Sequence, residues 1–104
     1  MSWLYLFIAS IFEIGWPLGL KLADTTNHKF LWFLFAIIAM GLSGYFLFLA
    51  QKEIPIGTAY AIWTGLGMIG TFLLGIILFH DALSLIKFIG FIFILIGIII
   101  LKIY

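Results

Sequence analysis

The sequence has no cysteine and no arginine, and only 9% of its 104 residues are charged. Without cysteine, a disulfide and a thiolate metal site are both excluded. Five lysines against four acidic residues give a net charge of +1, which leaves no basic patch for nucleic acid. Hydrophobic residues make up 66% of the chain, whereas soluble domains are roughly half apolar. These values exclude a water-soluble fold and indicate a membrane protein.

Four long stretches of the chain carry almost no charge: residues 3–22, 30–50, 57–79 and 83–103. A bilayer core about 30 Å thick needs roughly 20 apolar residues in a helix. Backbone groups in lipid must be satisfied within the segment, so these stretches are predicted to be helices. We expect a single all-α domain over residues 1–104, with four transmembrane helices joined by loops too short to hold a second domain.

Three aromatic residues lie near the expected helix ends: Trp3, Trp32 and Tyr104. Aromatic rings with a polar edge favour the headgroup region of a bilayer. We expect these three side chains to anchor the helices at the interface, with no further role.

Lysines are balanced across the expected topology. Lys52, Lys102 and the N-terminal amine lie on one side of the membrane, and Lys21, Lys29 and Lys87 lie on the other. Orientation follows the lysine bias of short loops, and here there is none. Such a chain can insert both ways, and two opposite copies would form an inverted repeat of the kind used in alternating access. The alternative is that a lipid or a partner fixes one orientation.

Glu13 is the one acidic residue well inside an expected span. A carboxylate there costs roughly 3 kcal/mol or more, so such a residue indicates a functional site. Because the charged form is costly away from water, Glu13 is expected to bind either a proton or a cation. Competition between the two would allow exchange transport. The alternative is a protonated, purely structural hydrogen-bonding group.

Aromatic and small polar residues can surround this acid. Trp16 shares the Glu13 face at a helical offset of three, and Tyr60 and Trp63 share a face of the third helix. Trp16 can stack on a flat cation or simply pack, and the other two rings can be packing residues. Ser43, in a segment of small residues on the second helix, can hydrogen-bond to Glu13 or serve packing alone.

Two pairs of glycines have predicted roles in the third and fourth helices. Gly65 and Gly67 would permit either a bend or a close helix approach. Gly90 and Gly97 are two turns apart on one face of a helix that has no residue able to bind a cation. The fourth helix is therefore predicted to be an association surface, and a dimer is the natural minimum for enclosing a pathway.

The chain resembles the small multidrug resistance family of bacterial inner-membrane transporters over essentially its whole length. The resemblance rests on Glu13 together with Lys21 at the end of the same expected helix, on the stretch from Pro55 to Gly65, and on the Gly90 to Gly97 spacing. It implies an antiparallel, dual-topology homodimer in which both Glu13 side chains share a site that exchanges protons for cations. It also implies that the fourth helix forms the dimer contact and that Gly65 and Gly67 kink the third.

Within this family the stretch Phe12 to Trp16 is more similar to the guanidinium exporters than to the exporters of quaternary ammonium drugs. By that resemblance the substrate and proton site consists of Glu13, Trp16, Ser43, Tyr60 and Trp63. Guanidinium is planar and rich in donors, which suits pairing with a carboxylate beside an aromatic ring.

We therefore expect a proton-coupled guanidinium exporter of the bacterial inner membrane. Its expected partners are a small cation, protons, the bilayer and a second copy. We expect no nucleic acid, metal or cofactor. We also expect no catalytic residue, because the chain is predicted to be a transporter and not an enzyme. One alternative is an exporter of quaternary ammonium or lipophilic cationic drugs. A second, of a different class, is a non-transporting membrane subunit or pore in which Glu13 is structural.

Overall fold

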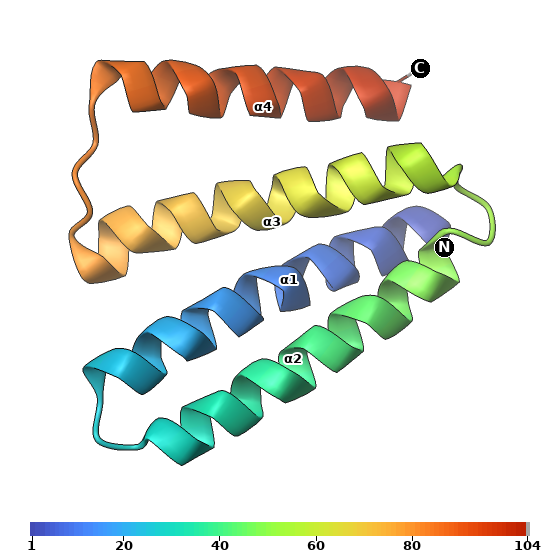
Figure 1. Ribbon diagram of the computed structural model, residues 1–104. Helices are drawn as coiled ribbons and strands as arrows, with labels where there is room; N and C mark the ends of the chain where they lie inside the picture. The colour runs from blue at the N-terminus through green and yellow to red at the C-terminus, as the bar shows by residue number, and fades with distance from the viewer. Residues whose placement is uncertain (104) are drawn as a thin grey trace.

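A computed structural model describes residues 1–103, and the expected anchor Tyr104 lies outside the described residues. These residues form four helices: α1 (Ser2–Thr25), α2 (Lys29–Ala50), α3 (Ile56–Phe79) and α4 (Leu85–Ile103). Each is long and apolar enough to cross a membrane. The prediction of an all-α protein with four transmembrane helices is thus confirmed. Figure 1 shows the start of α1, the end of α4 and the α2–α3 loop at the same end of the molecule.

Local hydrogen bonds explain where two of the helices end or begin. The hydroxyls of Thr25 and Thr26 donate back to the carbonyls of Lys21 and Leu22, at 3.1 and 2.7 Å, which extends α1 beyond its last apolar turn. At the start of α4 the hydroxyl of Ser84 accepts a hydrogen bond from the Lys87 amide at 3.2 Å. Serine in this position caps a helix, so α4 begins at Leu85.

The helices form a thin layer in the order α2, α1, α3, α4 (Figure 1). The molecule measures 44 × 35 × 16 Å, so its shortest dimension is little more than one helix diameter. α1 packs against both α2 and α3, whereas the backbone of α4 lies close only to α3 within residues 1–103. The central position of α1 gives the residues at its middle two neighbouring helices.

Small residues bring α1 and α2 together. A Cβ atom on Gly19 would lie 2.8 Å from Phe35 and 3.1 Å from the carbonyl oxygen of Trp32. Near the next turn, a Cβ on Gly15 would lie 3.3 Å from the Cβ of Ala39. Because membrane helices lack a hydrophobic force between them, close packing at small residues is a main source of association.

One cluster of buried apolar residues lies toward the end of the molecule where α1 starts and α4 ends (Figure 1). It comprises Leu6, Ala50, Ile54, Ala59, Ile62 and Ile98, from all four helices and the α2–α3 loop. Ile98 is the one buried residue of α4 among those described. Near this core the buried hydroxyl of Ser2 donates to Glu53 Oε2 at 2.9 Å, which joins the start of α1 to the α2–α3 loop.

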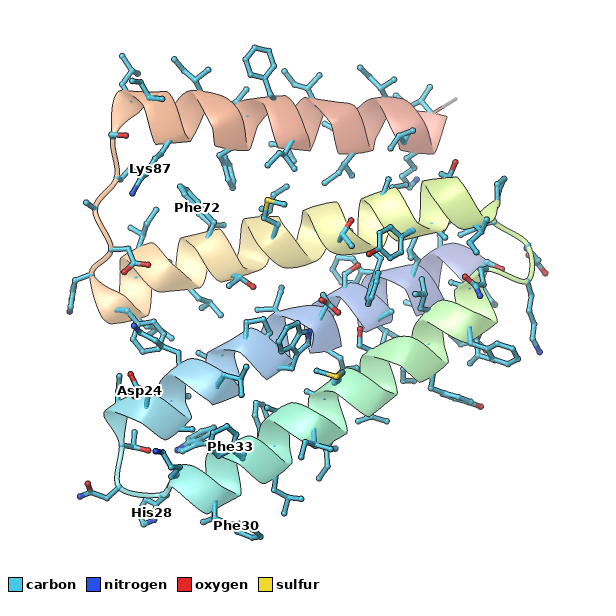
Figure 2. All side chains as sticks on the ribbon, in the orientation of Figure 1. Asp24, His28, Phe30, Phe33, Phe72 and Lys87 are labelled. Atoms are coloured by element: carbon cyan, nitrogen blue, oxygen red, sulfur yellow. The ribbon has the colours of Figure 1, made fainter. Side chains whose placement is uncertain are left out.

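Large apolar side chains cover the outer surfaces. Phe30 is 76% exposed and projects from the start of α2 away from the other helices (Figure 2), and Ile86 on α4 is 81% exposed. Trp3 lies near the start of α1, and the Lys102 ammonium is 5.2 Å from its ring centroid. Trp32 is half-buried and packs edge-on against Phe35. Such surfaces suit contact with lipid or with another apolar protein face.

Candidate cation site around Glu13

Glu13 lies at the middle of α1, between α2 and α3, and is half-buried. The only proline inside a helix of the described chain, Pro17, follows it by one turn. Proline has no backbone N–H, so the carbonyl of Glu13 loses its usual helical donor. The residue therefore presents both a carboxyl group and a free backbone carbonyl in the centre of the layer.

Side chains from three helices form a connected set of hydrogen bonds at this point. Trp16 Nε1 donates to Glu13 Oε1 at 2.9 Å, and Ser43 Oγ lies 3.3 Å from Glu13 Oε2. Trp63 Nε1, from α3, donates to Ser43 Oγ at 2.8 Å. Of the five residues predicted to form the site, the structure thus joins four in one network.

Ser43 is fully buried and has a single hydroxyl proton to give. Its Oγ lies 2.8 Å from the carbonyl oxygen of Ala9, a shorter contact than the one to Glu13. With Trp63 donating to the hydroxyl and Ala9 accepting from it, one acceptor position of Oγ remains. A protonated Glu13 can donate to that position, whereas an ionised Glu13 needs the Ser43 proton or another donor.

Gly67 is required for this arrangement. A Cβ atom on Gly67 would lie 2.6 Å from Glu13 Cγ and 3.1 Å from Glu13 Cβ. One turn away, a Cβ atom on Gly70 would likewise overlap the side chain of Ile14. The two glycines allow α3 to approach the acidic face of α1. The role of Gly70 was not predicted from the sequence, since it depends on the register of two apolar helices.

Tyr60 lies beside the network rather than in it. Its ring packs at 5.4 Å and 61° against Trp63, and the side chain is 57% exposed. Within residues 1–103 no hydrogen bond joins its hydroxyl to Glu13. In a single chain, Tyr60 therefore extends the aromatic wall of Trp63 toward the open surface.

The other glycines singled out from the sequence lie outside the network. Gly65 faces α4, where a Cβ would lie 2.7 Å from Ile98 Cδ1, so it provides a close helix contact in an α3 that is one continuous helix. Gly90 and Gly97 have no heavy atom within 4 Å of the position of a Cβ. Each of these two glycines therefore leaves an open space on the surface of α4.

An open cavity of about 450 Å³ adjoins Glu13 and extends along α3. Its lining includes Thr71, Phe72 and Asp81. Asp81 lies in the α3–α4 loop and is exposed. However, His80 adopts a left-handed backbone conformation, and the carboxyl group of Asp81 folds back against Gly75. No pattern in the sequence indicates this contact beyond a glycine one turn before the end of the helix.

A family model described as Small Multidrug Resistance protein matches residues 1–96. The chain belongs to the small multidrug resistance family. The resemblance inferred from Glu13, the Pro55 to Gly65 stretch and the Gly90 to Gly97 spacing is thereby confirmed.

Relatives of this small multidrug resistance protein match it over nearly their full length. A protein of Proteus vulgaris is 42% identical over 105 residues, covering 98% of this chain and 97% of the relative. One from Yersinia pseudotuberculosis is 40% identical over 102 residues, with the same coverage. One from Escherichia coli K12 is 36% identical over 102 residues, covering 98% of this chain and 96% of the relative. All three are named guanidinium exporter.

Membership in this family, together with four apolar helices, makes the chain a multi-pass transporter of the bacterial inner membrane. The network around Glu13 is chemically suited to that role, because it places one ionisable group among fixed donors at the centre of the helical layer. No group of three or more metal-ligating side chains occurs within residues 1–103.

Proposed function

We propose that this protein exports guanidinium and small guanidinyl cations in exchange for protons, with Glu13 as the shared binding group. The observation that carries the proposal is the carboxyl group of Glu13, half-buried and oriented by Trp16 and Ser43 from two helices. The names of the relatives support guanidinium as the substrate.

The geometry suits a planar cation with several donors. Within residues 1–103 each carboxyl oxygen of Glu13 has one hydrogen-bond partner, Trp16 at Oε1 and Ser43 at Oε2. A carboxylate has about four acceptor positions, so a guanidinium ion can add two parallel N–H hydrogen bonds. The rings of Trp63 and Tyr60 provide an aromatic wall beside the site.

Exchange follows from competition for one carboxylate. A proton on Oε2 makes Glu13 a donor, and Ser43 Oγ is within reach to accept it. Guanidinium requires the same oxygen to be ionised and free. Because the two states exclude each other, a carrier that changes its open side only when Glu13 is occupied moves protons one way and cations the other.

A second copy, inserted in the opposite orientation, completes the proposed transporter. One chain is a layer only 16 Å thick with the Glu13 cavity open on one side. Tyr60 is exposed, and α4 has almost no buried residue among those described. In the proposed antiparallel homodimer the two Glu13 cavities face each other, α4 forms the dimer contact through Gly90 and Gly97, and α3 bends at Gly65 and Gly67.

The decisive experiment measures substrate-evoked current in proteoliposomes of the purified protein. Guanidinium should evoke a current that an opposing proton gradient modulates, whereas tetraethylammonium should evoke little. Glu13→Gln keeps the shape of the side chain and removes its charge, so the current should vanish while the helical content and the dimer persist.

Glu53→Gln is the matched control, since it makes the same chemical change in the α2–α3 loop, where the amide can still accept from Ser2. Its current should equal that of the unmodified protein. An undiminished current in Glu13→Gln would refute the proposal, and equal currents for both cations would make the protein a broad exporter of cationic drugs.

A further inference from the structure

A second cavity, of about 250 Å³, lies at the end of α1 and α3 and shares Pro17, Thr71 and Asp81 with the cavity of Glu13. The two cavities therefore have a common wall that runs from the centre of the layer to the α3–α4 loop. A cation leaving Glu13 along this wall meets the hydroxyl-bearing Thr71 and then the carboxyl group of Asp81.

The outer cavity has the chemistry of a cation site. Asp81 folds back against Gly75, where the absence of a side chain leaves room for the carboxyl group. The amide of Asp81 donates to the carbonyl of Gly75 at 3.0 Å, which holds the loop in this turn. Carbonyls at the end of a helix carry partial negative charge, so a carboxylate beside them creates a region that favours a cation.

A cation already lies in this region of the structure. The ammonium group of Lys21, which lines the outer cavity, is 5.7 Å from the ring centroid of Phe79. Phe79 lines the same cavity as Asp81. A carboxylate with an aromatic face nearby repeats, at the mouth, the combination that Glu13 and the tryptophans form at the centre.

We propose that Asp81 and Phe79 form an outer subsite for guanidinium-class cations at the mouth of the Glu13 cavity, with the Lys21 ammonium over the Phe79 ring when no substrate is bound. The subsite raises the concentration of guanidinium near the pathway. When guanidinium binds, it replaces the ammonium group of Lys21. This inference rests on the proposed function, because it assigns the outer site to the same substrate.

The test compares guanidinium transport by Asp81→Asn and Asp24→Asn in proteoliposomes at low ionic strength. Asp24 is exposed at the end of α1 (Figure 2), at the same end of the molecule as the α3–α4 loop (Figure 1), but does not line either cavity. Asp81→Asn should raise the KM for guanidinium roughly 3- to 10-fold with a maximal current within about 2-fold of the unmodified protein. Asp24→Asn should change neither value, and Asp81→Glu should restore the KM.

An unchanged KM in Asp81→Asn, or a lower maximal current with an unchanged KM, overturns the subsite while the proposed function stands. No guanidinium current from the unmodified protein overturns both. If Asp81→Asn does not assemble, nuclear magnetic resonance of Glu13→Gln titrated with guanidinium chloride gives the answer. Saturable amide shifts at residues 79–81, absent with sodium chloride at equal ionic strength, support the subsite, and their absence overturns it.

Discussion

The hydroxyl group of Ser43 on α2 connects three helices through its hydrogen bonds. Ala9 on α1 accepts from it, Trp63 on α3 donates to the same oxygen, and Glu13 lies within reach. Ser43→Ala would leave the Trp63 N–H without this partner in a buried setting, at a cost of about 1–3 kcal/mol. Because the hydroxyl also meets the protonated form of Glu13, we expect guanidinium transport to fall roughly 10-fold.

Ser10→Ala is the control for that measurement of proteoliposome flux. The Ser10 hydroxyl is also buried but bonds only within α1, to the carbonyl of Leu6 at 2.9 Å. Its loss should leave transport close to that of the unmodified protein. Equal reductions in both variants would show that Ser43 acts through helix packing and not through the network.

Gly67→Ala tests the close approach of α3 to Glu13. The added methyl group would overlap the Glu13 side chain, so α1 and α3 must separate or Glu13 must change rotamer. Overpacking of this kind costs about 1–3 kcal/mol. We expect a lower melting temperature in detergent and a large loss of guanidinium transport. Gly44→Ala, on an open face of α2, should retain both properties, and wild-type behaviour of Gly67→Ala would contradict the geometry.

At the level of single residues, a functional charged group inside a membrane span could be predicted from the sequence. The backbone conformation of a loop could not. Glu13 was singled out because a charge in a span is expensive. The position of Asp81 could not be predicted, because its contact with Gly75 depends on the left-handed conformation of His80. Such backbone geometry is uncommon for a residue other than glycine and has no clear pattern in the sequence.

Among the four helices, α4 packs least against the rest of its own chain. Its backbone lies close only to α3 within the described residues, and Gly90 and Gly97 leave open spaces on its surface. If α4 is the dimer contact, Gly97→Leu should weaken the dimer strongly, because leucine fills a space that the second copy needs. Cross-linking in membranes or energy transfer between labelled copies measures this loss.

Gly41→Leu provides the comparison for that experiment. Gly41 is equally open but lies on α2. The single chain tolerates either leucine, so a difference in dimer content reports the partner surface and not the fold. Dimer content that is unaffected by Gly97→Leu would place the contact elsewhere.

The existence of the four helices could be predicted from hydropathy, but their neighbours could not. An amphipathic helix shows its buried face in its sequence, whereas a helix that is apolar on all sides does not. In lipid the packing partners are chosen by small residues such as Gly19 and Gly70. Their matching positions on other helices become known only from the three-dimensional arrangement.

For the whole molecule, the balance of lysines predicts insertion in both orientations. Adding lysines to the α1–α2 loop by Asn27→Lys and His28→Lys should favour one orientation, and Lys29→Gln with Lys87→Gln should favour the other. Either variant alone should lose most of its guanidinium export, because its copies share one orientation. Coexpression should restore export.

Reporter fusions at the C-terminus determine the orientation of each variant, and cellular guanidinium resistance measures its activity. Each variant retaining full export with a single orientation would exclude the antiparallel arrangement. A parallel dimer, or a partner chain that fixes the orientation, would then be required.

The thinness of the layer has a genetic consequence. In the proposed antiparallel dimer, a chain 16 Å deep encloses no pathway of its own, so every working unit would draw on two molecules. Where intact and defective copies mix at random, the number of fully intact pairs falls with the square of the intact fraction. An inactive allele that still assembles should therefore suppress its normal counterpart, whereas a null allele should only reduce the amount of transporter.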